Sequence, residues 1–153
     1  MPKPPSVTDQ KLIRTVSAVI FDVSGRVLLV RKHGSAIFIQ PGGKPEPGES
    51  ALETLVRELD EELDEELGVG VVEGSASCLG RFEDEAVHEV GWRIRTETWV
   101  VSITGTPAAC GEIAELAWVN PSLPGDLNIA PLSRNHILPA VRALNGDGQQ
   151  AGG

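Results

Sequence analysis

The sequence predicts a single layered domain of the α/β (α+β) class. Segments rich in β-branched and aromatic residues occur in both halves of the chain, and two segments with helical spacing interrupt and follow them. The resulting order of strands, helix, strands and helix is typical of helices packed on a sheet. The chain has 153 residues, about one domain, and its hydrophobic fraction of 41% is that of a protein with a packed core.

We expect the domain to occupy residues 13–145. Residues 1–12 are polar and proline-bearing and are expected to form a flexible N-terminal arm, and residues 146–153 a flexible tail. The N-terminal segment lacks the apolar core of a secretory signal, and no run approaches the ~18 apolar residues of a membrane span. Cys78 and Cys110 match no metal or redox spacing. A cytoplasmic protein is therefore expected.

The first elements are expected to be strands. Val16–Phe21 and Val27–Val30 flank a turn at 22–25, which favours a β-hairpin. A short apolar run, Ala36–Ile39, leads into a proline and two glycines, and the two prolines and two glycines of 43–49 predict a loop.

A helix is expected from Ser50 to Leu67, ending at Gly68. Ser50 and Glu53 have the spacing of a capping box, in which each side chain accepts the backbone N–H of the other residue. Its apolar residues fall on one stripe at helical spacing: Leu52, Leu55, Val56, Leu59 and Leu63.

The second half of the chain is expected to be mostly strand. The β-type segments are Val69–Val72, Ala76–Phe82, Trp92–Ile103 and Leu116–Val119. Residues 121–131 are rich in turn formers, and a last helix is expected at Ser133–Leu144.

The expected first helix carries an unusual acidic face. Glu58, Glu61, Glu62 and Glu65 lie at i, i+3, i+4 and i+7, where like charges repel by a few tenths of a kcal/mol per pair. One interpretation is a solvated surface. The other is a site for a divalent cation such as Mg²⁺, which prefers oxygen ligands and commonly combines carboxylates with waters and phosphates.

The net charge of −9 bears on the partners of the protein. It disfavours non-specific binding to nucleic acid or to an anionic membrane, because phosphate contacts require basic patches. A phosphate ester can still bind to an acidic protein if cations lie between the two.

The loop and helix together resemble the Nudix box, G-x5-E-x7-R-E-U-x-E-E-x-G-U, in which U is a bulky aliphatic residue. Gly43 is followed after five residues by Glu49, and seven more residues lead to the segment RELDEEL, which begins at Arg57. The resemblance implies a Nudix-type α/β/α sandwich with a mixed central sheet, and Mg²⁺-dependent hydrolysis, with Mn²⁺ as a possible substitute.

The end of the box departs from the pattern. The expected glycine and aliphatic residue come four residues late, at Gly68-Val69, after a second Leu-Asp-Glu-Glu unit. Counting from the loop gives an acidic triad of Glu58, Glu61 and Glu62, whereas counting back from Gly68 gives Glu65 and Glu66 and loses the arginine. We prefer the first register because it keeps Arg57 and the distance from the loop to the carboxylates.

By resemblance, Glu58, Glu61 and Glu62 bind the catalytic metal ions, and the carbonyl of Gly42 is a further ligand. Arg57 and Glu49 form an ion pair that orients the loop and the helix. The interpretation without function is an exposed ion pair of little worth.

A further carboxylate is expected from the segment GEIAELAWV, since many relatives have one ahead of a strand that bears tryptophan. Glu112 suits that place and Glu115 is the rival. Glu61, Glu62 and Glu112 all remain candidates for the catalytic base.

Substrate residues are weakly encoded. Arg31, Lys32, His33 and Lys44 lie near the loop, and we single out Arg31 and Lys44 for the phosphates, although such residues are more often ordinary surface charge.

The resemblance implies hydrolysis of the pyrophosphate bond in a nucleoside diphosphate linked to another moiety: a nucleoside triphosphate, a nucleotide sugar or a dinucleotide. The alternative is a nucleotide-binding or sensing domain with weak or no turnover, and a third possibility is an interaction protein with an acidic surface. The expected partner is a small nucleotide, with no nucleic acid or membrane; a homodimer is possible but is not readable from the sequence.

Overall fold

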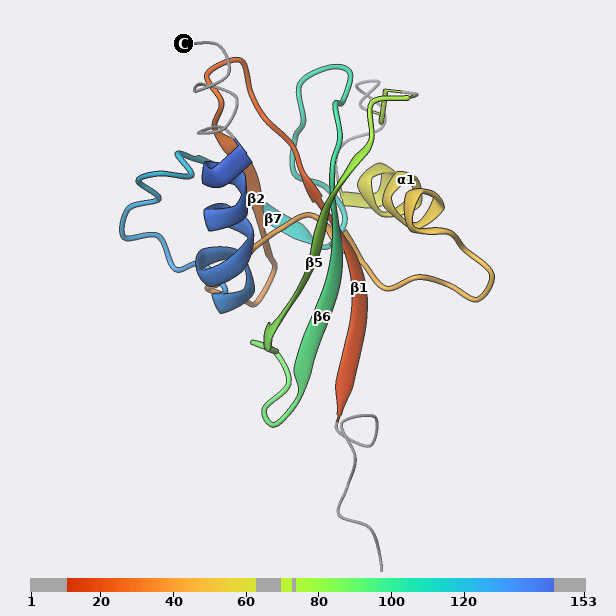
Figure 1. Cartoon of the computed structure of the whole chain (residues 1–153), viewed down its shortest axis with the longest axis vertical. Helices are drawn as coiled ribbons and strands as arrows, with labels where there is room; N and C mark the ends of the chain where they lie inside the picture. The colour runs from red at the N-terminus through yellow and green to blue at the C-terminus, as the bar shows by residue number, and fades with distance from the viewer. Residues whose placement is uncertain (1–10, 63–69, 73, 145–153) are drawn as a thin grey trace, which may run out of the picture.

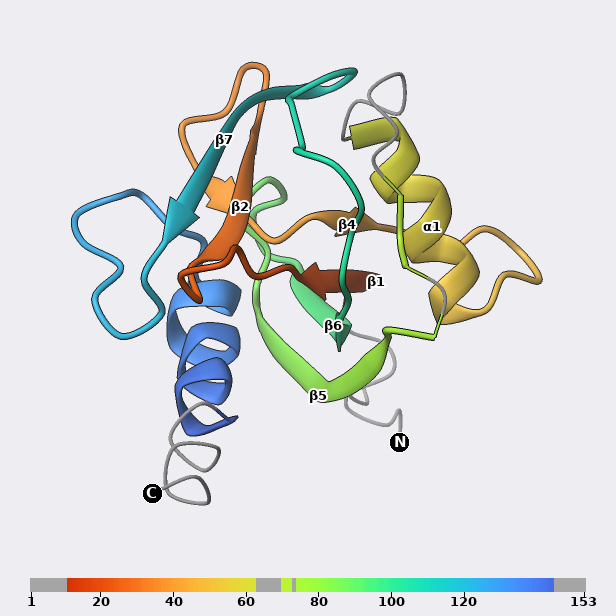
Figure 2. The same ribbon diagram turned by 90° about the horizontal axis from the view of Figure 1, so that it is seen from above.

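The protein is a sandwich of two helical layers around β-sheets. The computed structural model describes residues 11–62, 70–72 and 74–144. Helix α1 (Ala51–Glu62) lies on one side of the strands and a helical segment at 131–144 lies on the other (Figures 1 and 2). The C-terminal segment contains a π-helical stretch, η3 (Ser133–Ile137). These layers confirm the expected α/β/α arrangement.

The larger sheet has mixed strand directions, as expected, and the order β4-β1-β6-β5. Strand β1 (Leu12–Val19) runs parallel to β6 (Arg93–Val100), and β5 (Ser77–Glu85) runs antiparallel to β6. The very short β4 (Gly42–Gly43) pairs antiparallel with the other edge of β1. The glycine segment of the chain is therefore part of a sheet, and not only a loop.

Among the described residues a second sheet is antiparallel, with the order β3-β2-β7. It contains β3 (Phe38–Ile39), β2 (Val27–Lys32) and β7 (Ile113–Val119). The expected hairpin between the first two strands was therefore wrong except next to its turn, where Leu28 N–H donates to Ile20 O at 3.0 Å. Beyond that point β1 and β2 diverge into different sheets, which lets the apolar residues of both strands be buried.

Helix α1 packs on the sheets through Leu55 and Leu59, which are buried against β1 and β2. The expected apolar stripe was too wide, because Leu52 and Val56 are exposed. The capping box is confirmed: Glu53 N–H donates to Ser50 Oγ at 3.1 Å, and Ser50 N–H donates to Glu53 Oε1 at 3.0 Å. The expected end of the helix at Gly68 lies outside the described residues.

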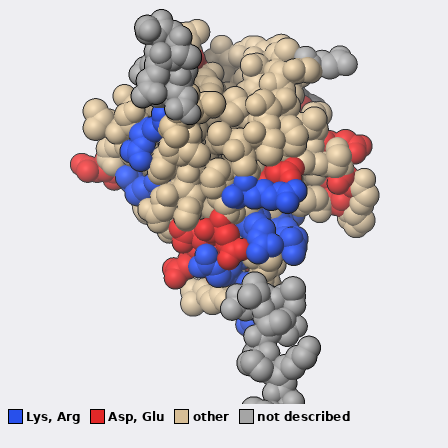
Figure 3. Space-filling view, in the orientation of Figure 1, with Lys and Arg blue, Asp and Glu red and all other residues tan. Residues whose placement is uncertain are grey.

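The outer face of β5 and β6 carries interleaved charges rather than a basic patch (Figure 3). Arg93 and Arg95 both bind Glu83, at 2.7 and 2.9 Å, while Glu97 binds Arg81 at 3.1 Å. Arg93 therefore pairs across the sheet with Glu83. Within the described part of the chain, no helix is long and apolar enough to cross a membrane.

Candidate active site

The glycine bend brings backbone unusually close to β1. Gly42 has φ +141° and pairs with Ser17, and a Cβ on Gly42 would collide with the carbonyl oxygen of Val16. Only glycine fits this conformation and this contact. Ala18 N–H donates to Pro41 O at 2.9 Å, which anchors the bend to the sheet.

The next glycine makes room for a carboxylate. A Cβ on Gly43 would overlap the carboxyl group of Glu58, which comes from the first helix after the loop. The side chain of Glu58 therefore lies directly on the backbone of β4. Gly43 is required here by a close approach, and not by a turn.

Glu62 is the most unusual carboxylate of the site. It is only 6% exposed, because it lies on the same buried stripe of α1 as Leu55 and Leu59. Its Oε1 accepts the N–H of Gly42 at 2.9 Å, whereas its buried Oε2 has no hydrogen-bond partner among the described residues. Burial raises the pKa of Glu62 to about 8. The fold thus buries a carboxyl group in which one oxygen accepts a hydrogen bond and the other has no partner among the described residues.

Arg57 ties the loop to the helix. Its Nε and Nη2 donate to the two oxygens of Glu49 at 2.8 and 2.9 Å, a bidentate pair. Nη2 also donates to the backbone oxygen of Lys44 at 3.0 Å, and Nη1 to Glu58 at 2.8 Å. The hydrogen bonds from Arg57 lower the pKa of Glu49 to about 2. The structure thus contains the ion pair that the resemblance implies.

Glu61 lies apart from the other two carboxylates. Its side chain is 63% exposed, its Oε1 is 3.8 Å from Arg57 Nη1, and it is absent from the cavity that Glu58 and Glu62 line. Helical geometry separates Glu61 from its neighbour Glu62 by about 100°. Glu65 and Glu66, the carboxylates of the alternative register, lie outside the described residues.

Glu112 reaches the site through the end of α1. Cys110 donates from its N–H to Glu62 O at 3.3 Å and from Sγ to Glu61 O at 3.2 Å, so this segment is hydrogen-bonded to the last described residues of α1. The next residue is Gly111, where a Cβ would press on Glu61 O at 2.9 Å. Glu112 follows at the rim of the cavity, with 83% of its side chain exposed and Lys32 Nζ at 4.0 Å.

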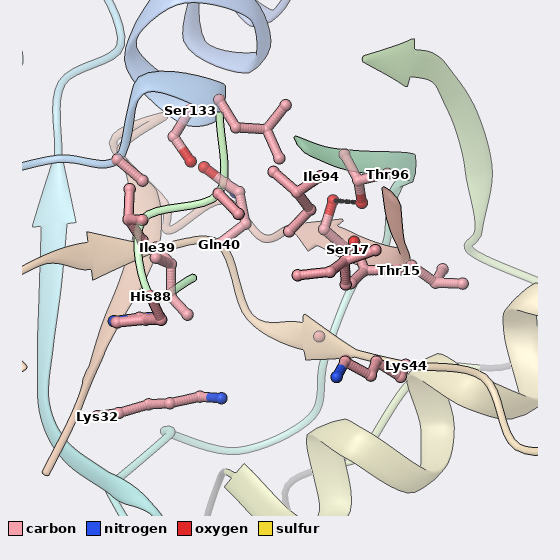
Figure 4. Close-up of a pocket in the computed structure, with 18 of the residues that line it drawn as sticks. Thr15, Ser17, Lys32, Ile39, Gln40, Lys44, His88, Ile94, Thr96 and Ser133 are labelled. Atoms are coloured by element: carbon pink, nitrogen blue, oxygen red, sulfur yellow. Dashed lines mark hydrogen bonds between the residues drawn. The ribbon is translucent and has the colours of Figure 1, made fainter. Parts of the chain in front are cut away.

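A single cavity of about 380 Å³ joins these groups, a size suited to a small ligand. Its acidic end contains Gly42, Gly43, Glu58, Glu62 and Glu112, together with Lys32 and Lys44. Figure 4 shows the two lysine side chains on the side of β4 and α1, and Gln40 and Ser133 on the side of the C-terminal helix. We call that second side the apolar end, since Ile39, Ile94, Leu132 and Ile137 also line the cavity.

Of the two basic residues singled out from sequence, Lys44 lines the cavity and Arg31 does not. Arg31 donates to Glu115 at 3.0 Å and to the backbone of Ser35 at 2.9 Å. Lys32 lines the cavity instead, because successive residues of a strand point to opposite faces. Glu115 pairs with Arg31 and does not line the cavity, whereas its rival Glu112 does.

A divalent cation fits the acidic end. The described residues contain no group of three His, Cys, Asp or Glu side chains that could cage an ion by themselves. Mg²⁺ does not need one, because it commonly uses one or two carboxylates plus waters and phosphates. The unpartnered, buried Oε2 of Glu62 and the adjacent Glu58 carboxylate supply such ligands.

Sequence reasoning missed Gln40 and Ser133, which line the apolar end. Gln40 is a polar residue between the apolar run Ala36–Ile39 and the proline that precedes the glycines, and this was a signal that could have been read. Ser133 offered no comparable signal, because it was expected only as the start of a helix.

Comparisons with known proteins identify the family of this chain. The family model of the NUDIX domain matches residues 11–139. None of the curated protein sequences compared with the chain matches it.

Several solved structures have the same fold. The ORF135 protein of E. coli is 31% identical, with a TM-score of 0.70 over 92% of this chain and 95% of that one. A MutT protein from Methanosarcina mazei Go1 is 23% identical, with a TM-score of 0.70 over 90% and 97% of the two chains. The dihydroneopterin triphosphate pyrophosphohydrolase of E. coli is 17% identical, with a TM-score of 0.60 over 85% and 95%.

The last two likenesses concern the fold alone, whereas the family match and the ORF135 protein extend to sequence. With the α/β/α layers and the loop–helix geometry described above, they establish that this chain belongs to the Nudix family and is a pyrophosphohydrolase of that family.

Proposed function

We propose that the protein hydrolyses the pyrophosphate bond of a nucleoside diphosphate linked to another group, with Mg²⁺ as its cofactor. The observation that carries this proposal is the meeting of Glu58 and Glu62 on the Gly42-Gly43 backbone at one end of a cavity. The same end contains Lys32 and Lys44, whose charges suit phosphate oxygens.

Glu58 and Glu62 would hold the cation, with Glu61 and the carbonyl of Gly42 as further candidate ligands. When bound there, Mg²⁺ supplies neutralisation of phosphate charge and a lowered pKa for an attacking water. This explains how a chain of net charge −9 can bind a polyanion.

The residues of the chain would then position the phosphates. Lys32 and Lys44 lie in the cavity as two separate positive charges. Arg57 holds the backbone of Lys44 and the carboxylates of Glu49 and Glu58 at once, so that loop and helix keep a fixed geometry. We assign Arg57 and Glu49 this positioning role, since neither lines the cavity.

The proton of the attacking water requires a base. Glu112 stands at the rim with most of its side chain exposed, whereas Glu62 has one oxygen committed to Gly42. We favour Glu112 for this step, with Glu62 and Glu61 as the alternatives. Replacing the true base should remove the acidic limb of the pH profile of kcat/KM.

The test is a panel of nucleoside triphosphates, nucleotide sugars, ADP-ribose and dinucleoside polyphosphates, assayed with Mg²⁺ or Mn²⁺ and with EDTA. Products are separated by anion-exchange chromatography. We expect phosphate-bearing products from at least one class and none with EDTA. We also propose the cytoplasm as the location, since free nucleotides are abundant there.

Two outcomes would contradict the proposal. A melting temperature that rises with nucleotide and Mg²⁺, but without product, would identify a binding domain without turnover. No product and no thermal shift with any member of the panel would leave only a structural or interaction role.

A further inference from the structure

The apolar end of the cavity is suited to a group with an apolar surface. Aliphatic side chains approach it from three parts of the fold: Ile39 from β3, Ile94 from β6, and Leu132 and Ile137 from the C-terminal helical segment. Such walls favour an apolar body with few polar edges, because each unpaired polar group brought there costs free energy.

One polar side chain in this wall has an incomplete hydrogen-bond set. Gln40 is 7% exposed, and its Nε2 donates to the carbonyl oxygen of Ala18 at 2.9 Å. Its Oε1 is buried and has no partner among the described residues. The bond to Ala18 fixes which way the amide faces, because the opposite orientation would set two acceptors against each other.

A second polar group lines the same cavity. In Figure 4 the oxygen-bearing ends of Gln40 and Ser133 point toward one another across the apolar end. Ser133 is also buried, and it lines the same cavity. A serine hydroxyl can donate or accept, whereas the oxygen of Gln40 can only accept.

The unpaired oxygen of Gln40 would therefore be satisfied by a hydrogen-bond donor on an otherwise apolar, planar group. The exocyclic amino group of cytosine or adenine is such a donor, and the ring behind it matches the aliphatic surroundings. Uracil and hypoxanthine present a carbonyl acceptor at the same position. A ribose matches poorly, because its several hydroxyls would leave unpaired polar groups against the isoleucines and leucine.

We propose that Gln40 selects nucleotides whose base carries an exocyclic amino group, by accepting a hydrogen bond from that group at the apolar end of the cavity. This inference rests on the proposed function, since it takes the phosphates to bind at the acidic end. Because Gln40 Oε1 is buried, the base reaches it only if the side chains around it shift.

The first test uses the unaltered protein and pairs of substrates that differ only at this position: CTP with UTP, and ATP with ITP. If another class is turned over best, the pairs are CDP-glucose with UDP-glucose, or ADP-ribose with its hypoxanthine analogue. We expect kcat/KM to favour the amino member by about tenfold to a hundredfold in both pairs. The triphosphate of the 4-deamino analogue of cytidine has no exocyclic group at C4, and its kcat/KM should be close to that of UTP.

The second test replaces the acceptor. Gln40→Met keeps the length of the side chain, and it should reduce the amino/keto ratio to within about threefold, mainly by slowing the amino member. Ser17→Ala is the matched control: Ser17 is buried in the same cavity, but its hydroxyl is already bonded to those of Thr96 and Thr98. The amino/keto ratio of kcat/KM in Ser17→Ala should equal that of the unaltered protein.

Turnover with amino/keto ratios near one in the unaltered protein would overturn this inference and leave the proposed function intact. That result is expected if a rotated Ser133 hydroxyl already satisfies Gln40. An unchanged ratio in a folded Gln40→Met variant would also overturn it. If that variant does not fold, the substrate pairs still decide. Failure to hydrolyse any member of the panel would instead contradict the proposed function.

Discussion

The two ends of the cavity are built in different ways. The acidic end comes largely from one continuous stretch, Gly42 to Glu62, in which a glycine strand, a loop and a capped helix follow one another. The apolar end takes Gln40, Ile94 and Ser133 from segments far apart in sequence. The comparison suggests that the chemistry of the site is encoded locally, whereas its selectivity depends on how distant segments pack.

The two ends of the cavity also differ in charge. The acidic end concentrates carboxylates and lysines around backbone, and one carboxylate there is buried without full pairing. Among the described residues, the apolar end presents the unpaired amide oxygen of Gln40 between aliphatic side chains and Ser133. Changes at the acidic end should therefore act on turnover, and changes at the apolar end on the choice among substrates.

The largest expected effect comes from the buried carboxylate. Glu62→Gln keeps an acceptor for Gly42 but removes the negative charge, and kcat should fall at least about a hundredfold, since a lost metal ligand costs several kcal/mol of transition-state stabilisation. Glu58→Gln should behave alike. Steady-state kinetics with saturating Mg²⁺ measures both.

Asp60→Asn is the control on the same helix, since Asp60 does not line the cavity, and it should stay near the unaltered rate. Glu66→Gln should also be nearly silent. A loss in Glu66→Gln equal to that in Glu62→Gln would mean that the acidic motif must be counted from Gly68.

Arg57→Lys should have the next largest effect. Lysine keeps the charge but cannot make the bidentate contact to Glu49 while also holding Glu58 and the backbone of Lys44. We expect kcat to fall about tenfold with a smaller change in KM, because loop and helix lose their fixed geometry. Unchanged kcat in this variant would show that the clamp stabilises the fold without serving the reaction.

A comparison of Lys32→Ala with Arg31→Ala sharpens the assignment of the phosphate contacts. Lys32 lines the cavity, so its loss should raise KM about tenfold. Arg31 is held by Glu115 and the backbone of Ser35, so its loss should leave KM within about twofold. The reverse order would place the phosphates on the other face of β2.

The smallest expected effect concerns pH and stability without metal. The pKa of Glu62 is about 8 in the folded protein, above its ordinary 4.5, so the folded state binds the extra proton between these values. Stability should therefore fall as pH rises from about 5 to 8. Glu62→Gln should flatten this slope and raise the melting temperature at pH 8 by about 2–6 °C in EDTA. A slope unchanged by Glu62→Gln would assign the dependence to other groups.

Glu49 provides the opposite case. Arg57 holds its pKa at about 2, below the ordinary 4.5, so its contribution to stability is present above pH 4.5 and is lost as pH falls toward 2. Thermal melts between pH 5 and 3 should show a shallower loss in Glu49→Gln than in the unaltered chain.

The sequence alone determined the elements whose cause is local. The capping box of Ser50 and Glu53 and the glycine bend follow from the local sequence of one loop and helix. The ion pair of Arg57 with Glu49 was implied by the resemblance of the same stretch to the Nudix box. Spacing also placed Glu58, Glu61, Glu62 and Glu65 on one helix face. It could not show that Glu58 and Glu62 line the cavity while Glu61 does not.

Tertiary structure decided the rest. Periodicity could not show that β1 and β2 enter different sheets, that Lys32 and not Arg31 faces the cavity, or that Gln40 and Ser133 line the same cavity. It also could not show that Cys110 would donate to the carbonyls of Glu61 and Glu62 and so bring Glu112 to the rim. These contacts join residues tens of positions apart, and such contacts depend on how sheets and helices pack, which the local pattern of polar and apolar residues does not specify.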